Sequence, residues 1–122
     1  MSVNRFSLPL CLMFLVGSTV AKGDPRDFDQ FLKPLLAQKC VKCHGETRVS
    51  GDIDLEQITT SDQLLKQPQL IEKMIEVIDG NNMPPEDEPQ LEEQTRTSLL
   101  TRLKTMLRES VSGQEVKQPR VR

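Results

Sequence analysis

Apolar residues recur every three or four positions between residues 28 and 43, and this spacing predicts an amphipathic helix. The stripe consists of Phe28, Leu32, Leu36 and Cys40, with Phe31, Leu35 and Cys43 in neighbouring positions. Asp24 or Asp27 is suited to cap its start. Because Pro34 lacks a backbone N–H, the helix either begins near Lys33 or kinks there. The two cysteines therefore continue the apolar stripe and are expected on the core side.

Two more helical regions follow, separated by segments rich in polar and turn-forming residues. Residues 45–60 are rich in such residues and predict a loop. The next helical region opens at Ser61, breaks at Pro68 and ends at Gly80, which is placed as a C-cap. Its apolar positions are Leu70 or Ile71, Met74, Ile75 and Ile78. A last helix is predicted over residues 90–111, with an apolar face made of Leu99, Leu103, Met106 or Leu107, and Val111. With little strand pattern elsewhere, the sequence predicts an all-α fold.

The N-terminus has the organisation of a secretory signal peptide over residues 1–21. Arg5 supplies a positive charge, residues 6–16 form an apolar run, and the small residues that follow suit cleavage after Ala21. A membrane span needs about 18 or more apolar residues, so a cleaved signal is favoured over a retained N-terminal anchor. The sequence thus predicts export and no membrane span in the mature chain.

The predicted mature chain is a single small domain over residues 22–111, followed by a disordered tail over residues 112–122. Phe28 and Phe31 are its only aromatic residues. A domain of this size with so little aromatic volume would gain from a large, flat, apolar cofactor in its core.

Charge is distributed unevenly along the predicted mature chain. Residues 22–93 carry 8 basic and 16 acidic side chains, whereas residues 94–122 carry 7 basic and 2 acidic ones. Such asymmetry could steer an encounter with a charged protein partner, although solvated helix faces and a basic tail explain it as well. The chain lacks a concentrated basic patch with interleaved aromatic residues, so no binding of nucleic acid is expected.

A CxxCH motif begins at Cys40 and contains the only histidine of the protein, His44. Cys40 and Cys43 share one face of a helical turn, so both thiols can reach the edge of one porphyrin and add to its vinyl groups. His44 lies on the same side, where its imidazole can bind the iron. The motif therefore predicts one covalently bound haem c, attached through Cys40 and Cys43 with His44 as the proximal ligand.

Other uses of a CxxC pair fit the chain less well. A structural zinc ion needs four ligands, and the sequence has no second cluster of cysteine or histidine to complete the set. A thioredoxin-like redox pair is expected among alternating strands and helices. In an oxidising compartment an unmodified pair forms a disulfide. An exported interaction module stabilised by a disulfide or by zinc is thus kept as an alternative.

The second axial ligand of the iron must be a different residue type, because His44 is the sole histidine. Methionine is a common partner of histidine in cytochromes c. Met74 and Met106 fall on helical apolar stripes, where methionine usually fills the core. Met83 lies outside any helical pattern in residues 80–85 (GNNMPP), and the two prolines after it restrict the backbone. We predict that Met83 binds the iron, and five-coordinate haem is the alternative.

The order of these features resembles the planctomycete-type cytochrome c domain of the class I cytochrome c fold. The features are a helix ending in CxxCH, the stretch GDIDL at residues 51–55, a central helix leading to GNNMPPEDEPQ at residues 80–90, and a closing helix. The resemblance covers roughly residues 27–109. It implies three to four helices wrapped around one covalently bound haem, crossing first and last helices, proximal His44 and distal Met83.

Family members usually carry this domain within much larger exported proteins, so a stand-alone carrier and a fragment of a longer protein are both compatible with the sequence. We expect an exported, periplasmic mono-haem cytochrome that passes single electrons to a redox protein partner. No residue group resembles a catalytic site, so no enzymatic activity is expected. The competing function is a five-coordinate haem sensor or ligand-binding module.

Overall fold

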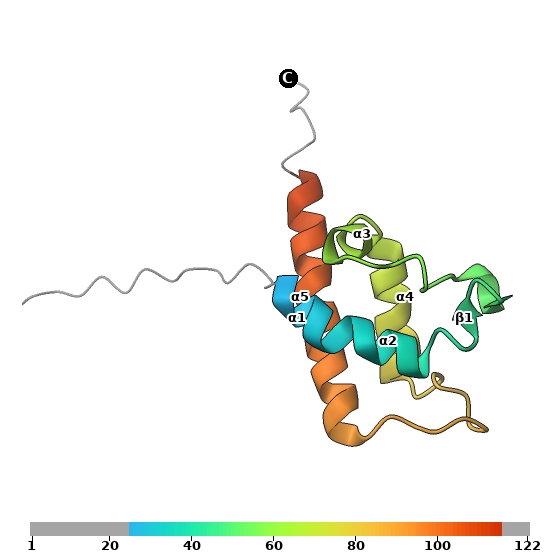
Figure 1. Cartoon of the computed structure of the whole chain (residues 1–122). Helices are drawn as coiled ribbons and strands as arrows, with labels where there is room; N and C mark the ends of the chain where they lie inside the picture. Colours follow the sequence, from blue (N-terminus) through green and yellow to red (C-terminus); the bar gives the residue numbers. More distant parts are fainter. Residues whose placement is uncertain (1–24, 116–122) are drawn as a thin grey trace, which may run out of the picture.

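The computed structural model describes residues 25–115, which form a mostly helical unit with one small sheet (Figure 1). The helical elements are α1 (Pro25–Asp27), η1 (Phe28–Leu32), α2 (Lys33–Lys39), α3 (Ser61–Leu65), α4 (Pro68–Asp79) and α5 (Glu93–Glu115). Between α2 and α3 lie the strands β1 (His44–Gly45) and β2 (Arg48–Val49) and a 3-10 turn, η2 (Ser50–Asp52). The predicted signal peptide and residues 116–122 of the predicted tail lie outside the described residues.

Pro34 explains the irregular first helix. The chain is helical on both sides of the proline, and η1 is a π-helical turn in which the Lys33 N–H bonds to Phe28 O. A proline removes one N–H from the helix and its ring crowds the carbonyl of the preceding turn, which the wider π turn accommodates. The sequence left two alternatives, a helix that begins near Lys33 and a helix that kinks there. The structure has the second, because one helical segment continues through an irregular turn directly before Lys33.

The predicted break at Pro68 is confirmed, because α3 ends before it and α4 begins there. Thr60 caps α3 through a reciprocal pair of hydrogen bonds with Gln63. The Gln63 N–H donates to Thr60 Oγ1 at 3.3 Å, and Gln63 Oε1 accepts from the Thr60 N–H at 3.0 Å. This capping box fixes the point at which the loop enters the helix.

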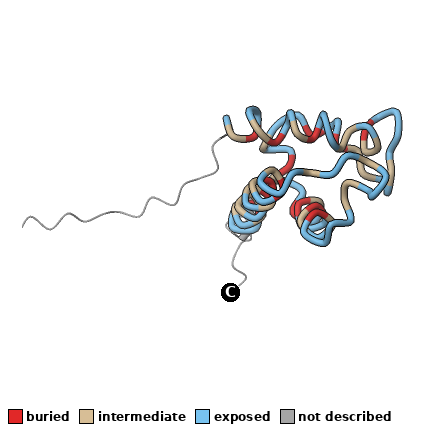
Figure 2. The backbone as a smooth tube through the Cα atoms, turned by 90° about the horizontal axis from the view of Figure 1, so that it is seen from below, coloured by how far each residue is buried: buried red, intermediate tan, exposed pale blue. Residues whose placement is uncertain are grey.

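The core lies where α2, α4 and α5 face one another, and Figure 2 shows the buried stretches on the inner sides of these helices. The buried apolar side chains are Phe28, Leu32, Leu36, Leu55, Ile58, Leu64, Ile71, Met74, Ile78, Leu99 and Leu103. The predicted stripes of the first and central helices are thus confirmed. Phe28 is the only aromatic residue in this set, as the composition implied.

The last helix differs from its prediction in bounds and in one core residue. It begins at Glu93 and continues to Glu115, beyond the predicted end at position 111. Val111 is 43% exposed, so its assignment to the apolar face was wrong. At about 3.6 residues per turn, Val111 lies about 120° around the helix from Leu99, whereas Ser110 lies almost in line with Leu99. Ser110 is buried and its hydroxyl donates to Leu65 O, which ties α5 to the end of α3.

The first and last helices cross, as Figure 1 shows for the segment α1 to α2 and α5. Arg102 on α5 makes this contact: its Nε lies 2.8 and 2.9 Å from the carboxylate oxygens of Asp27. Its guanidinium also stacks 4.0 Å from the centre of the Phe31 ring. The Arg102 side chain therefore makes both an ion pair and a cation–π contact where the first and last helices cross. Along residues 25–115, no helix is both long and apolar enough to cross a membrane.

Candidate functional site

The end of α2 presents the two cysteines from one turn. Cys40 is the C-cap of α2, and its N–H donates to Leu36 O at 2.9 Å. The N–H groups of Cys43 and His44 both donate to Cys40 O, at 3.1 and 2.9 Å. Both cysteines are half-buried and free. The helical spacing that the sequence analysis used for the CxxCH motif is thus present in the structure.

Cys40 lies against the apolar core, as its place on the stripe predicted. Burial raises the pKa of the Cys40 thiol to about 11, because the apolar surroundings disfavour the charged thiolate. At neutral pH this side chain is therefore a neutral thiol that points toward the interior.

His44 is oriented by a hydrogen bond that the sequence did not reveal. Its Nδ1 lies 2.8 Å from Ser50 O. A carbonyl oxygen only accepts, so Nδ1 donates this bond, and in the neutral imidazole Nε2 then keeps its lone pair for a metal. The antiparallel pairing of His44 with Val49 in β1 and β2 places the next carbonyl, that of Ser50, beside the ring.

The hairpin is a feature that the sequence analysis missed, since it expected only a loop over residues 45–60. Strands of two residues are too short to show an alternating pattern. Gly45 is needed in this hairpin because a Cβ there would lie 2.6 Å from Val41 O and 2.9 Å from Glu56 Oε2. That Glu56 oxygen accepts the N–H of Glu46 at 2.9 Å. The histidine loop is therefore packed too closely for any larger residue at position 45.

Met83 follows α4 and is anchored to its last turn. The N–H groups of Asn82 and Met83 both donate to Val77 O, at 2.8 and 3.1 Å. Asn81 has φ 55°, and its N–H bonds to Ile78 O at 3.2 Å. These bonds form a Schellman motif, in which Gly80 is the C-cap as predicted but Asn81 takes the left-handed conformation.

The three methionines of the described chain have different surroundings. Met74 is buried and Met106 packs against the core, so both occupy the core positions that their helical spacing predicted. Met83 is half-buried in the loop after α4. Its thioether is therefore neither core filling nor fully exposed.

An ion pair links the loop of the cysteines to the loop of Met83. Lys42 Nζ lies 2.5 Å from Glu88 Oε1. The hydrogen bond that Lys42 donates to Glu88 and the negative charge of that carboxylate raise the pKa of Lys42. Lys42 is exposed, as expected for a surface lysine, so this pair contributes little energy. The pair is informative for another reason. It shows that the loop of the cysteines and the loop of Met83 are in contact, although Lys42 and Glu88 are 46 positions apart in the sequence.

The donor set fits a haem c. Cys40 and Cys43 supply two free thiols, His44 supplies a fixed imidazole, and Met83 supplies a half-buried thioether. Within residues 25–115, no three side chains of His, Cys, Asp or Glu are grouped so that they could hold a metal ion. A haem requires no such group, because the porphyrin provides four of the iron ligands and the protein only the axial ones.

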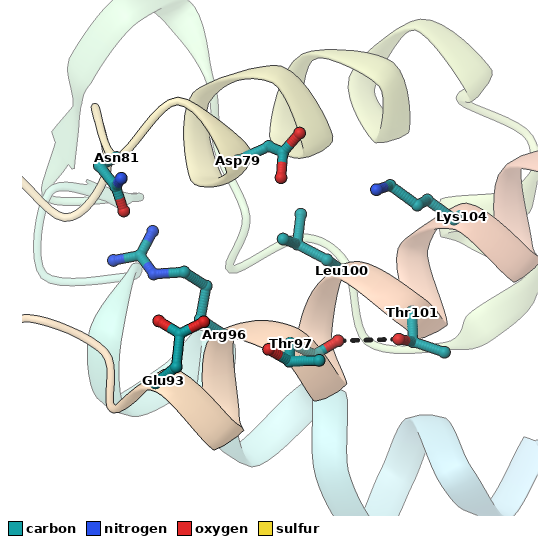
Figure 3. A pocket seen from close by; sticks show the side chains of 8 residues that line it. All are labelled: Asp79, Asn81, Glu93, Arg96, Thr97, Leu100, Thr101 and Lys104. Atoms are coloured by element: carbon teal, nitrogen blue, oxygen red, sulfur yellow. Dashed lines mark hydrogen bonds between the residues drawn. The ribbon is translucent and has the colours of Figure 1, made fainter.

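A separate pocket of about 330 Å³ lies between the end of α4 and the first half of α5 (Figure 3). Its lining residues are Asp79, Asn81, Glu93, Arg96, Thr97, Leu100, Thr101 and Lys104, none of which is a predicted ligand. The Arg96 side chain is buried, and its Nη1 donates to Ile78 O at 2.5 Å. This cation complements the negative end of the α4 dipole and stabilises the turn that leads to Met83.

Comparison with known proteins identifies one family. Residues 40–87 match the family model described as Planctomycete cytochrome C, and the matched range includes all four predicted haem-binding residues. The resemblance stated from the sequence is therefore confirmed over these residues. Searches among curated proteins and among solved structures found no match to this chain.

Proposed function

We propose that the protein is an exported, periplasmic mono-haem cytochrome that transfers single electrons, because residues 40–87 match the family model described as Planctomycete cytochrome C. Its haem c would be attached to Cys40 and Cys43, with His44 and Met83 as axial ligands. In this proposal the protein is an electron carrier rather than an enzyme, and it exchanges electrons with a redox protein partner.

The observation that carries the proposal is the hydrogen bond between His44 Nδ1 and Ser50 O. Ligating histidines usually donate their second ring N–H to a carbonyl or a carboxylate, which fixes the tautomer and makes the other nitrogen a better ligand. Here the only histidine has that partner, directly after two free thiols spaced for one porphyrin. This combination suits a haem c site, whereas a module held by a disulfide does not require an oriented imidazole beside the cysteines.

The distal side supports the same proposal. Met83 is tied to Val77 O, and Glu88 in its loop is tied to Lys42 in the loop of the cysteines. A methionine held there would serve as the second protein ligand of the iron and would raise the reduction potential relative to a second histidine. Burial of the haem against the apolar core would raise the potential further, since it disfavours the extra charge of the ferric state.

When bound, haem supplies an iron ion that takes up and releases one electron. The residues of the chain have the other tasks. Cys40 and Cys43 would hold the porphyrin edge by thioether bonds, Ser50 O would keep the His44 ring in one orientation, and the Met83 loop would close the opposite side. None of these groups has to change its protonation state during electron transfer.

The experiment is expression of the whole chain in a host that matures haem c, followed by intact mass and a denaturing gel stained for haem peroxidase activity. We expect the mass of the chain from residue 22 plus one haem, and a stained band. Replacement of Cys40 and Cys43 by alanine should remove the stain. A colourless protein with the mass of its amino acids alone would contradict the proposal.

The sixth ligand separates the carrier from a haem sensor. A sulfur-to-iron absorption band in the oxidised protein would support Met83 ligation. Rapid uptake of carbon monoxide by the reduced protein, without that band, would instead favour the five-coordinate alternative.

A further inference from the structure

The loop from Met83 to Gln90 is organised by the side chain at its far end. Gln90 Nε2 lies 3.1 Å from Pro84 O, 2.7 Å from Pro85 O and 3.0 Å from Glu88 O. All three partners are carbonyl oxygens, which accept hydrogen bonds and cannot donate them. Of the two ends of the Gln90 amide, only the NH₂ group suits this position, and it shares two N–H donors among three acceptors.

This loop has few backbone N–H groups with which to form hydrogen bonds of its own. Three of its residues, at positions 84, 85 and 89, are prolines and lack an N–H donor. One internal backbone bond is present, from the Glu88 N–H to Pro85 O at 3.0 Å. The Gln90 amide therefore takes the place of the missing backbone donors.

The upstream end of the loop is already fixed, because the Met83 N–H donates to Val77 O in the last turn of α4. Downstream, Pro84 O belongs to the residue directly after Met83 and is one of the three carbonyls that Gln90 gathers. The ion pair between Lys42 and Glu88 is exposed to solvent and holds the loop only weakly. The Gln90 side chain is also exposed, but it contacts three loop carbonyls at once, so it is the main hydrogen-bonding constraint on the downstream side of Met83.

We propose that Gln90 is a positioning residue for the sixth iron ligand. By gathering the carbonyls of Pro84, Pro85 and Glu88, it holds the loop in the one shape that keeps the Met83 thioether directed at the haem. This inference rests on the proposed function, since it requires a haem bound by Met83.

The test uses the mature holoprotein and the nearly isosteric variant Gln90→Glu. A carboxylate would place an oxygen against three carbonyl oxygens, so the loop should open. We expect the sulfur-to-iron band of the oxidised protein to weaken or disappear. Carbon monoxide uptake by the reduced protein should become at least about tenfold faster, a ratio equivalent to about 1.4 kcal/mol, which one or two lost hydrogen bonds can account for.

The matched control is Gln94→Glu, which adds the same charge four residues away, at an exposed position in the first turn of α5. This variant should keep the band and the wild-type rate of uptake. Both variants should keep the same cooperative thermal unfolding, since the Gln90 loop lies outside the buried core. If Gln90→Glu does not mature, Gln90→Ala gives a second test, with the same direction of change and a smaller size.

The outcomes for the two proposals are distinguishable. A wild-type protein with the band, together with a Gln90→Glu variant that keeps the band and the wild-type rate, would overturn the role of Gln90 and leave the cytochrome intact. Equal losses in Gln90→Glu and Gln94→Glu would also overturn it, because charge alone would then be responsible. A wild-type holoprotein without the band would overturn both the Met83 ligation and the role of Gln90.

Discussion

The loop of the cysteines and the loop of Met83 are held by different kinds of contact. Residues 40–50 are held by their own backbone: turn bonds to Cys40 O, the pairing of β1 with β2, and the contact between His44 and Ser50 O. Residues 83–90 depend on side chains, chiefly Gln90, and on the last turn of α4. The loop of the cysteines is therefore held by local contacts, and we expect that the loop of Met83 can be disturbed without unfolding the domain.

The largest expected effect comes from removing the attachment itself. Replacement of both Cys40 and Cys43 by alanine should abolish stable folding, because the described core holds one buried aromatic residue and would lack the volume of the porphyrin. Circular dichroism during heating should show no cooperative transition. A compact helical apoprotein with a sharp transition would show that the proximal loop and the core fold without haem.

Met83→Ala should affect the distal side alone. The haem should stay attached, since neither thioether depends on Met83, but the sixth position should open. We expect the reduction potential to fall by at least about 60 mV, which is a tenfold change in the equilibrium constant of a one-electron couple. A redox titration with optical detection measures this change. An unchanged spectrum would show that Met83 is not a ligand, and Met106→Ala serves as the control.

Gly45→Ala should disturb the proximal loop by overpacking. The new methyl group would lie 2.6 Å from Val41 O and 2.8 Å from Val41 Cγ1, so the hairpin that carries His44 must shift. We expect a loss of about 1–3 kcal/mol in the free energy of unfolding, measured by chemical denaturation. Gly113→Ala, where a Cβ meets nothing within 4 Å, should not destabilise the protein. Equal effects at both positions would contradict the close packing of the hairpin.

The smallest effect is expected for Lys42→Met, which removes the ion pair between the two loops. An exposed pair is weakened by solvent and by salt, so the melting temperature should stay within error of the wild type at physiological ionic strength. Thermal melts at low and high salt would check this. A marked loss of the sulfur-to-iron band in this variant would show that the pair, rather than Gln90, fixes the Met83 loop.

Several parts of the fold follow directly from local sequence. The stripes through Phe28 and Ile71 gave the buried faces of two helices, because a helix places residues three or four apart on one side. Pro68 marked a real helix start. Val111 was misplaced because spacing alone does not fix the angular position of a residue after three turns, and small errors in periodicity accumulate along a long helix.

What the sequence alone determined is the chemistry of the site: two thiols and an imidazole within five positions, and a methionine among prolines. These features can be recognised without a structure because they depend only on residue type and short spacing. Tertiary structure decided how those groups are held. Ser50 acts through its backbone carbonyl, which every residue possesses, and Gln90 acts on carbonyls that only the folded loop gathers. Contacts of this kind leave no mark on residue type, so only the packing of the chain reveals them.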